Sequence, residues 1–226
     1  MVFRLAAPFE SLGFLGGTLY AIDRVLNRLS RHARLRHFDL MVQPVPDGPL
    51  LPERLSRRYT MRELHEGDPD LEFAPRPPEV LTRRFSQGAT CLGLFRKTAF
   101  VGYAWIQRGT YPEDEARCDW VLNDAASVFD FDVYIAPEHR GGVAFAALWN
   151  ETNRHLRERG VRESFSRVDR ANTGSRRAHA RLGARPVGSA VFLQLGQVEV
   201  MFASLSPFFY ISVSPGRRHA LRLKTG

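Results

Sequence analysis

The sequence of 226 residues predicts an α+β fold in which a mixed, mostly antiparallel sheet is flanked by helices. Short runs that favour strands recur from residue 89 onward, and the first two of them flank a tight turn as a hairpin. Longer runs repeat apolar residues at three- and four-residue steps, which is typical of amphipathic helices. One strand–helix–strand unit, over residues 128–168, lies at the centre of this order and predicts a β-α-β unit.

The N-terminal part is predicted to form an amphipathic helix from Thr18 to Arg36. Its apolar stripe consists of Leu19, Ile22, Val25, Leu26 and Leu29, while most arginines lie off the stripe. Such a helix could pack on its own domain, on a second copy of the chain in a homodimer, or on an anionic membrane surface. The predicted domains are therefore a helical extension, residues 1–36, and a main domain, residues 37–226.

The remaining elements follow in order along the chain. A strand over Phe38–Val45 ends in a proline-rich stretch, which favours a loop. Beyond it the sequence predicts the strand Tyr59–Leu64, the helix Glu79–Phe85, the hairpin strands Ala89–Arg96 and Ala99–Gln107, the strands Ala116–Leu122 and Val128–Ala136, the helix Gly142–Arg159, the strand Arg162–Val168, the helix Gly174–Leu182, and the strands Val187–Leu195 and Glu199–Leu205.

Charge and composition limit the partners and the compartment. The net charge is +8, but only Lys97 and Lys224 are lysine, and this arginine excess is more typical of a GC-rich genome than of nucleic-acid binding. No apolar run approaches the ~20 residues that span a bilayer, and no secretory signal is recognised. Cys91 and Cys118 match no metal-ligand spacing. We expect a cytoplasmic protein, peripheral at most on the inner membrane face, with no metal and no nucleic-acid partner.

The stretch Val133–Trp149 carries the first functional signal. A strand ends in Pro-Glu-His-Arg-Gly-Gly and passes directly into a helix. The first turn of a helix has unpaired N–H groups and a positive dipole end, and glycines let a bulky anion approach the backbone. Arg140 could add a charge-assisted hydrogen bond to a phosphate oxygen. The motif alone favours equally a phosphate site and a tight turn shaped by glycine.

A second motif, Asn172 to Gly188, follows about thirty residues later and reads NTGSRRAHARLGARPVG. Together, in this order and spacing, the two motifs resemble the GNAT family, the Gcn5-related N-acetyltransferases, and the resemblance covers residues 89–205 most clearly. Val143 and Phe145 stand where that family usually has glycines. A register shifted by one residue, from His139 through Gly142 to Ala144, restores the small residues but moves the arginine.

The resemblance implies a GNAT-like acyltransferase domain that transfers acetyl from acetyl-CoA directly to a small-molecule amine or amino sugar. The implied cofactor-binding residues fall into three groups along the chain. They are Val133, Tyr134 and Ile135 for the pantetheine arm, His139, Arg140, Gly141, Gly142, Val143 and Ala144 for the pyrophosphate, and Asn172 beside the thioester.

Two side chains are the candidates for proton transfer. His179 stands where the family often has its acidic tyrosine, and an imidazole with a pKa near ~6.5 could protonate a thiolate. Asp132 is the candidate base, because Asp130 and Asp132 should share one side of their strand and raise each other's pKa. The alternatives are a histidine that only packs and an ordinary ion-paired face. The acidic run Glu113–Glu115 could instead receive a cationic amine or be merely solvated.

Two further functions are kept beside N-acetyl transfer. One is transfer of a longer acyl chain at a membrane surface, where the helix predicted over residues 18–36 would dock. The other is a GNAT-fold module that binds CoA without catalysis, since the loop is atypical and the usual tyrosine is absent.

Overall fold

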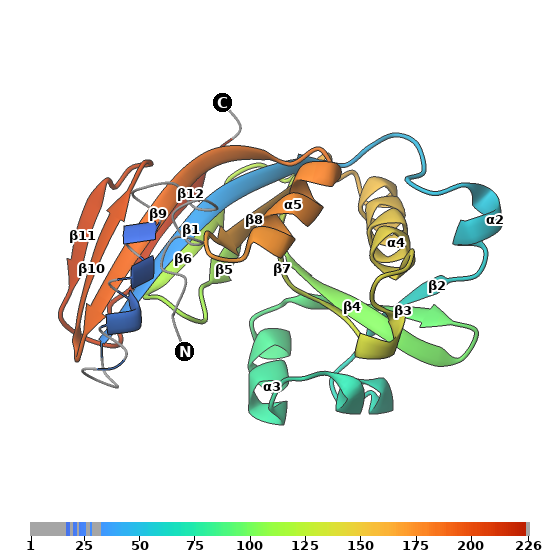
Figure 1. Cartoon of the computed structure of the whole chain (residues 1–226), viewed down its shortest axis with the longest axis horizontal. Helices are drawn as coiled ribbons and strands as arrows, with labels where there is room; N and C mark the ends of the chain where they lie inside the picture. The colour runs from blue at the N-terminus through green and yellow to red at the C-terminus, as the bar shows by residue number, and fades with distance from the viewer. Residues whose placement is uncertain (1–16, 19, 22, 26–27, 29–32, 225–226) are drawn as a thin grey trace, which may run out of the picture. The chain divides into compact units, whose positions relative to one another are not determined.

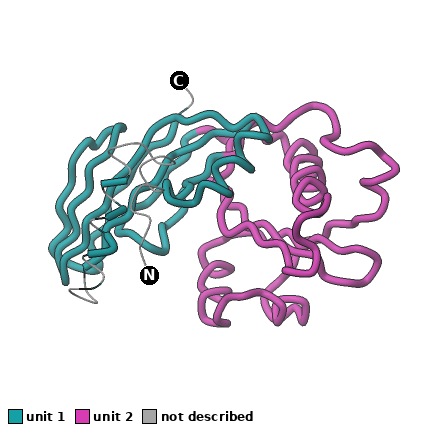
Figure 2. Tube along the Cα trace, viewed as in Figure 1, with its two compact units in different colours: residues 1–43, 110–123, 165–226 teal, residues 44–109, 124–164 magenta. Residues whose placement is uncertain are grey.

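The computed structural model describes residues 17–18, 20–21, 23–25, 28 and 33–224. These residues form two compact units, coloured separately in Figure 2. Unit 1 comprises residues 1–43, 110–123 and 165–226, and unit 2 comprises residues 44–109 and 124–164.

Unit 2 contains a four-stranded antiparallel stretch of sheet in the order β7-β4-β3-β2. The strands are β2 (Thr60–Leu64), β3 (Thr90–Arg96), β4 (Ala99–Gln107) and β7 (Ser127–Ile135). The helices are α2 (Glu53–Ser56), α3 (Pro78–Ser86) and α4 (Ala144–Glu158), with 3₁₀ turns η1 (Pro69–Phe73) and η2 (Pro137–His139). Figure 1 shows α3 and α4 on opposite sides of this sheet.

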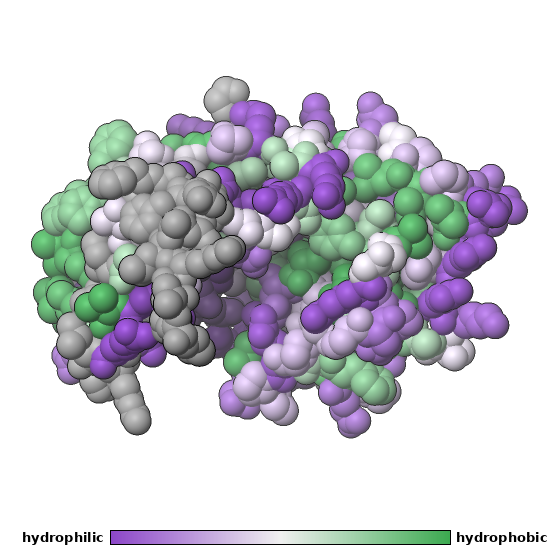
Figure 3. Space-filling model, viewed as in Figure 1, coloured by the Kyte–Doolittle hydropathy of each residue, from purple (hydrophilic) through white to green (hydrophobic). Residues whose placement is uncertain are grey.

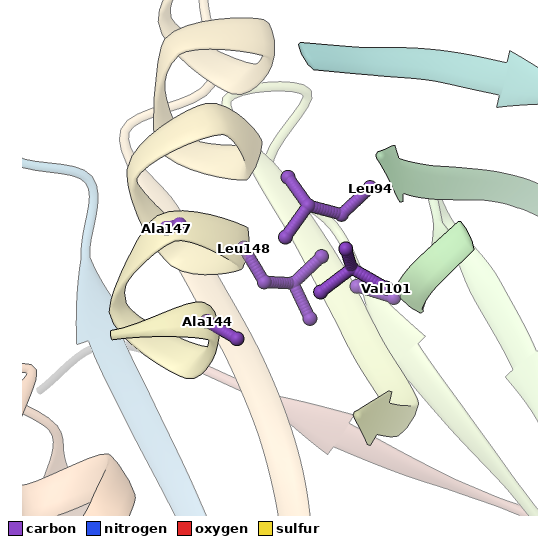
Figure 4. Packing of buried hydrophobic residues seen from close by; sticks show 6 residues of the cluster. Leu94, Val101, Ala144, Ala147 and Leu148 are labelled. Carbon is purple, nitrogen blue, oxygen red and sulfur yellow. The ribbon is translucent and has the colours of Figure 1, made fainter. Parts of the chain in front are cut away.

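The core of unit 2 forms because α4 presents its apolar stripe to one face of the sheet. Ala144 and Leu148 pack against Leu94 and Val101, as the close view in Figure 4 shows. Farther along the helix, Leu156 closes a second cluster with residues of β3, β4 and β7. Burial of such side chains contributes ~1.5–3 kcal/mol each, so this face holds the helix in place.

Unit 1 contains a second antiparallel stretch in the order β11-β10-β9-β1, with most of β8 next to β1. The strands are β1 (Ala33–Pro44), β8 (Glu163–Asp169), β9 (Arg185–Leu195), β10 (Val198–Ala203) and β11 (Phe209–Ser212). A three-stranded sheet in the order β12-β6-β5 is formed by β5 (Thr110–Pro112), β6 (Cys118–Leu122) and β12 (His219–Leu223). The helix α5 (Thr173–Arg181) completes the unit.

Most predicted elements are confirmed to within a few residues, and the α+β class is confirmed. The predicted end of the N-terminal helix at Arg36 is wrong. The described residues between 17 and 28 are helical, but Ala33–Arg36 belong to β1 and pair with β9. The rest of that helix lies outside the described residues. The division into an extension, residues 1–36, and a domain, residues 37–226, stays a prediction. Cys91 and Cys118 are buried free thiols.

Among the residues that the structure describes, none of the helices is long and apolar enough to cross a bilayer.

Candidate active site

The predicted site residues divide between the two units. Asp132 and the segment 133–144 belong to unit 2, whereas Asn172 and His179 belong to unit 1.

The segment that ends β7 has the backbone form that the sequence predicts. The strand passes into η2, and Gly141 has φ +78°, a left-handed conformation that favours glycine. Side chains built at Gly141 or Gly142 would meet nothing within 4 Å, so both glycines lie on an open surface. The hydrogen bonds of α4 begin with Ala147 N donating to Val143 O at 2.8 Å. The N–H groups of the first turn of α4 are thus of the kind that donates hydrogen bonds to an anion.

Arg140 lies on this segment with an exposed side chain. Its Nε donates to Ile135 O at 2.9 Å, and its guanidinium carbon lies 5.7 Å from the ring centre of Tyr134. One of the five N–H donors is used in this contact. The strand end therefore orients a guanidinium beside the glycine turn.

A β-bulge interrupts β7 just before this segment. Tyr103 of β4 pairs with Tyr134, and Trp105 pairs with Phe131, so two residues of β7 face only one of β4. Asp132 is one of the two, with φ +47°, a conformation that aspartate tolerates better than most residues. The bulge reverses the alternation of side chains beyond it.

The expectation that Asp130 and Asp132 share one side of the strand is therefore wrong. Asp130 pairs with Ile106, which packs in the cluster under α4. Asp132 is bound by Arg84 of α3, on the other side of the sheet.

Asp132 is the centre of a hydrogen-bonded network. Arg76 Nε donates to its Oδ2 at 2.8 Å, Arg76 NH2 and Arg84 NH1 also donate to its carboxylate, and Tyr103 Oη donates to Oδ2 at 3.2 Å. Burial alone would raise the pKa of Asp132, but the hydrogen bonds from Arg76 and Arg84 outweigh it and the pKa is lowered. Asp132 is thus ionised and ion-paired at neutral pH. Its pKa is lowered, whereas the prediction that it acts as a base assumed a raised pKa.

Asp130 is the carboxyl whose pKa is raised. Burial raises its pKa to about 7, although a hydrogen bond donated by Ser164 Oγ favours the ionised form. The cause is desolvation and not a neighbouring carboxylate.

In unit 1, Asn172 and His179 belong to α5. Asn172 is the N-cap of this helix, because its Oδ1 accepts a hydrogen bond from Ser175 N at 3.0 Å. His179 is 6% exposed, and burial lowers its pKa to about 4. The expectation that His179 titrates near neutral pH is wrong, and its imidazole is uncharged there.

The acidic run Glu113–Glu115 is buried at its first residue only, and Asp114 and Glu115 are exposed, so its role as an acceptor site stays a prediction. Glu113 is buried and accepts hydrogen bonds from Trp120 Nε1 at 2.8 Å and from Arg167 Nε at 2.9 Å. Glu115 is paired with Arg36 and Arg167. The buried Glu113 therefore stabilises unit 1.

A pocket of about 610 Å³ lies beside α3 and η1 in unit 2. Three carboxylates line it, from Glu66, Asp68 and Glu72, and Asp68 is paired with Arg62. Arg76 also lines the pocket and connects it to Asp132. Within the described part of the chain, no group of three or more His, Cys, Asp or Glu residues could hold a metal ion.

Sequence reasoning missed Arg76, Arg84 and Tyr103 as partners of Asp132. In a chain with so many arginines, no local spacing marks two that meet a carboxylate 56 and 48 positions away.

Comparisons with known proteins agree with the fold and the motifs. The acetyltransferase (GNAT) family matches residues 58–184. A search of curated proteins found no match. Solved structures give matches to the tandem GNAT protein of clavulanic acid biosynthesis, the glucosamine N-acetyltransferase region of a fungal multi-domain GH3 β-N-acetylglucosaminidase, and a GCN5-related N-acetyltransferase from Sphaerobacter thermophilus.

The three structural matches have low sequence identity. The tandem protein is 17% identical with TM-score 0.49, over 71% of this chain and 53% of that one. The fungal region is 13% identical with TM-score 0.52, over 76% of this chain and 22% of that one. The Sphaerobacter protein is 20% identical with TM-score 0.44, over 88% of this chain and 58% of that one. This chain thus spans about half and about a fifth of the first two, and the match to the fungal region shows a shared fold alone.

Proposed function

Because this chain belongs to the acetyltransferase (GNAT) family, we propose that it transfers an acetyl group from acetyl-CoA directly to an amine. The observation that carries the proposal is the segment from Ile135 to Ala144. It places an arginine, an open glycine turn and the first turn of α4 in succession. Pyrophosphate is the part of acetyl-CoA that such a segment suits.

On the donor side, the main chain of Val133–Ile135 would pair with the pantetheine arm, and the segment from His139 to Ala144 would hold the pyrophosphate. Arg140 is already oriented by Ile135 O, so it would lose little conformational freedom when it binds a phosphate oxygen. Charge-assisted hydrogen bonds contribute ~1.5–3 kcal/mol, or about tenfold or more in affinity.

On the acceptor side, the pocket beside α3 supports an amine. Glu66 and Glu72 bring negative charge to its wall and would attract an ammonium group. Arg76 would connect this pocket to the ion-paired Asp132. An amino sugar belongs among the amines to test, because one fold relative is a glucosamine N-acetyltransferase region.

In the proposed reaction, the amine nitrogen attacks the thioester carbonyl carbon, the C–S bond breaks, and the thiolate of CoA leaves. The amine must lose a proton and the thiolate must gain one. Asp132 and His179 stay predictions for these steps, and the lowered pKa of each counts against them. We therefore propose that Arg76, Arg84 and Asp132 fix the bulge of β7 next to the donor segment and act as positioning residues.

The experiment measures acetyl-CoA binding by calorimetry and CoA release with a panel of amines. Arg140→Ala should weaken binding by about tenfold or more. The matched control is Arg58→Ala, which removes an exposed arginine from another segment of unit 2 and should bind normally. Binding without turnover on any amine would favour a non-catalytic CoA-binding module. No binding of acetyl-CoA or of longer acyl-CoAs would refute the proposal.

The cytoplasmic location, the homodimer and the membrane contact through residues 18–36 stay predictions. A longer acyl donor is tested by the same calorimetry with long-chain acyl-CoA.

A further inference from the structure

The pocket beside α3 and η1 has an apolar wall as well as an acidic one. Leu71 of η1 and Leu81 of α3 line it, and both are buried, so packing fixes this wall in place. Phe85, one turn after Leu81, adds an aromatic ring whose centre lies 4.9 Å from that of Trp105. Among the described residues that line the pocket, Thr82 alone has an uncharged polar side chain. At the lower edge of the view in Figure 3, where α3 lies, hydrophilic and hydrophobic residues stand side by side.

The acidic wall has more negative charge than its surroundings balance. Glu66 and Glu72 are exposed and form no ion pair with another residue in the described part of the chain. The cation of the lining, Arg76, is paired with Asp132 and does not neutralise them. A pocket with two unpaired carboxylates attracts a cation.

The pocket lies next to the strand end that would hold the donor. Arg76 lines the pocket and donates to Asp132, the residue directly before Val133. Tyr103, which pairs with Tyr134, also donates to Asp132. The described residues that line the pocket all belong to unit 2, as the segment 133–144 does. One side chain therefore separates the pocket from the strand proposed to pair with the pantetheine arm.

From these observations we propose that the acetyl acceptor is a primary amine carried on an apolar chain or ring, and that it binds in this pocket. The inference rests on the proposed acetyl transfer and narrows its acceptor. Glu66 and Glu72 attract the ammonium group, and the apolar body covers Leu71, Leu81 and Phe85. A cavity of about 610 Å³ is large enough for a small ligand of this kind.

The amine binds as an ammonium ion and must lose two protons in the reaction. The first goes to water and leaves the nitrogen with a free electron pair. That pair forms the C–N bond with the thioester carbonyl carbon, and the C–S bond breaks. The second proton of the nitrogen goes to the departing thiolate, so the products are an N-substituted acetamide and CoA.

An amino sugar fits this pocket less well. Its ring has several hydroxyl groups, and a hydroxyl that leaves water for an apolar wall without a new hydrogen bond costs free energy. The wall formed by Leu71, Leu81 and Phe85 offers no side-chain hydrogen bond, and Thr82 offers one hydroxyl. An alkyl or aryl amine leaves no such group unpaired.

The test measures the binding of butylamine, hexylamine, 1-hexanol and glucosamine to the full chain by calorimetry at neutral pH. It is done with and without CoA, which has no acyl group to donate. Each buried methylene raises affinity by about fourfold, so hexylamine should bind about tenfold or more tightly than butylamine. Hexylamine should also bind more tightly than 1-hexanol, which lacks the charge, and than glucosamine, which lacks the apolar body.

The variant Glu66→Gln with Glu72→Gln removes both charges at nearly constant size, and both side chains are exposed, so the fold should be unchanged. Hexylamine should then bind about threefold or more weakly, close to 1-hexanol, while its advantage over butylamine stays. The matched control is Glu79→Gln, which removes an exposed glutamate of α3 that does not line the pocket. It should bind hexylamine as the native protein does.

Equal affinities for butylamine and hexylamine, a higher affinity for glucosamine, or no binding of any amine would overturn the proposal. Hexylamine binding that Glu66→Gln with Glu72→Gln leaves unchanged would overturn it too. Release of CoA from acetyl-CoA separates this inference from the proposed function. Release with glucosamine but not with hexylamine would leave the transfer standing and overturn the apolar acceptor. The expected order of affinities without release on any amine would support the apolar-amine pocket and refute the transfer.

Discussion

The buried ion pair at the bulge of β7 gives the sharpest prediction about stability. The side chains of Arg84 and Asp132 are 5% and 9% exposed, whereas the side chain of Arg76 is 42% exposed. The pair with Arg84 should therefore dominate, because solvent screens the pair with Arg76. Arg84 also lies 5.3 Å and 5.2 Å from the ring centres of Trp105 and Phe131, which hold it in place.

Asp132→Ala removes the carboxylate and leaves the Arg84 guanidinium in a buried site. Breaking a buried pair from one side costs ~3–5 kcal/mol. For a chain of this size each kcal/mol lowers the melting temperature by ~2–4 °C, so we expect a loss of about 6–20 °C. The assay is thermal unfolding by calorimetry or circular dichroism at neutral pH.

The matched control is Glu53→Ala, which breaks the exposed pair with Arg57 in the same unit. Such surface pairs contribute ~0.3–0.5 kcal/mol, so its melting temperature should fall by ~2 °C at most. The double variant Asp132→Ala with Arg84→Leu should be less destabilised than the sum of the single variants. An Asp132→Ala variant no less stable than Glu53→Ala would refute the reasoning.

The pH dependence of this pair has a definite sign. The folded-state pKa of Asp132 is lowered, so its contribution is present above the unfolded pKa of 3.8 and is lost as pH falls through the folded value. The destabilisation by Asp132→Ala should therefore shrink in acid. A difference between variant and native protein that stays constant down to the lowest measurable pH would contradict the assignment.

Three further outcomes follow from burial and backbone geometry. Gly102→Ala should cost ~1–3 kcal/mol in denaturant unfolding, because its Cβ would lie 2.2 Å from Tyr134 O, whereas Gly48→Ala, which meets nothing within 4 Å, should cost little. Asp130 has a folded pKa of about 7 against 3.8 unfolded, so the free energy of unfolding should decrease as pH rises from 4 to 7. Asp130→Asn should remove this decrease, and equal pH profiles of the variant and the native protein would contradict the assignment. In ¹H–¹⁵N spectra His179 should stay neutral down to pH near its pKa of about 4, and a midpoint near 6.5 would show that it is not buried.

Local signals in the sequence predicted much of unit 2. The hairpin of β3 and β4 follows from the Lys97–Thr98 turn, and Lys97 indeed has positive φ. The apolar stripe of α4 predicted the face that packs on Leu94 and Val101. These features depend on residues close in sequence, which is why a pattern reveals them.

Features that depend on distant partners were missed. Ala33–Arg36 continue a helical pattern, yet pairing with β9, more than 150 residues away, makes them a strand. β12 pairs with β6 across about a hundred residues, and no local signal marks it. The bulge at Asp132 depends on the register with β4 and on two distant arginines. The alternation of side chains along a strand predicts which face of the sheet a residue lies on only where the pairing with the neighbouring strand is regular.

The most direct test of the donor site compares the binding of CoA and of pantetheine, which lacks the pyrophosphate and the nucleotide. If the segment from Arg140 to Ala144 holds the pyrophosphate, the native protein should bind CoA at least about tenfold more tightly than pantetheine, since one charged hydrogen bond contributes that much. Arg140→Ala should weaken CoA binding while leaving pantetheine binding unchanged. Equal affinities of the native protein for both molecules, or equal losses for both in Arg140→Ala, would show that this segment is only a turn between β7 and α4.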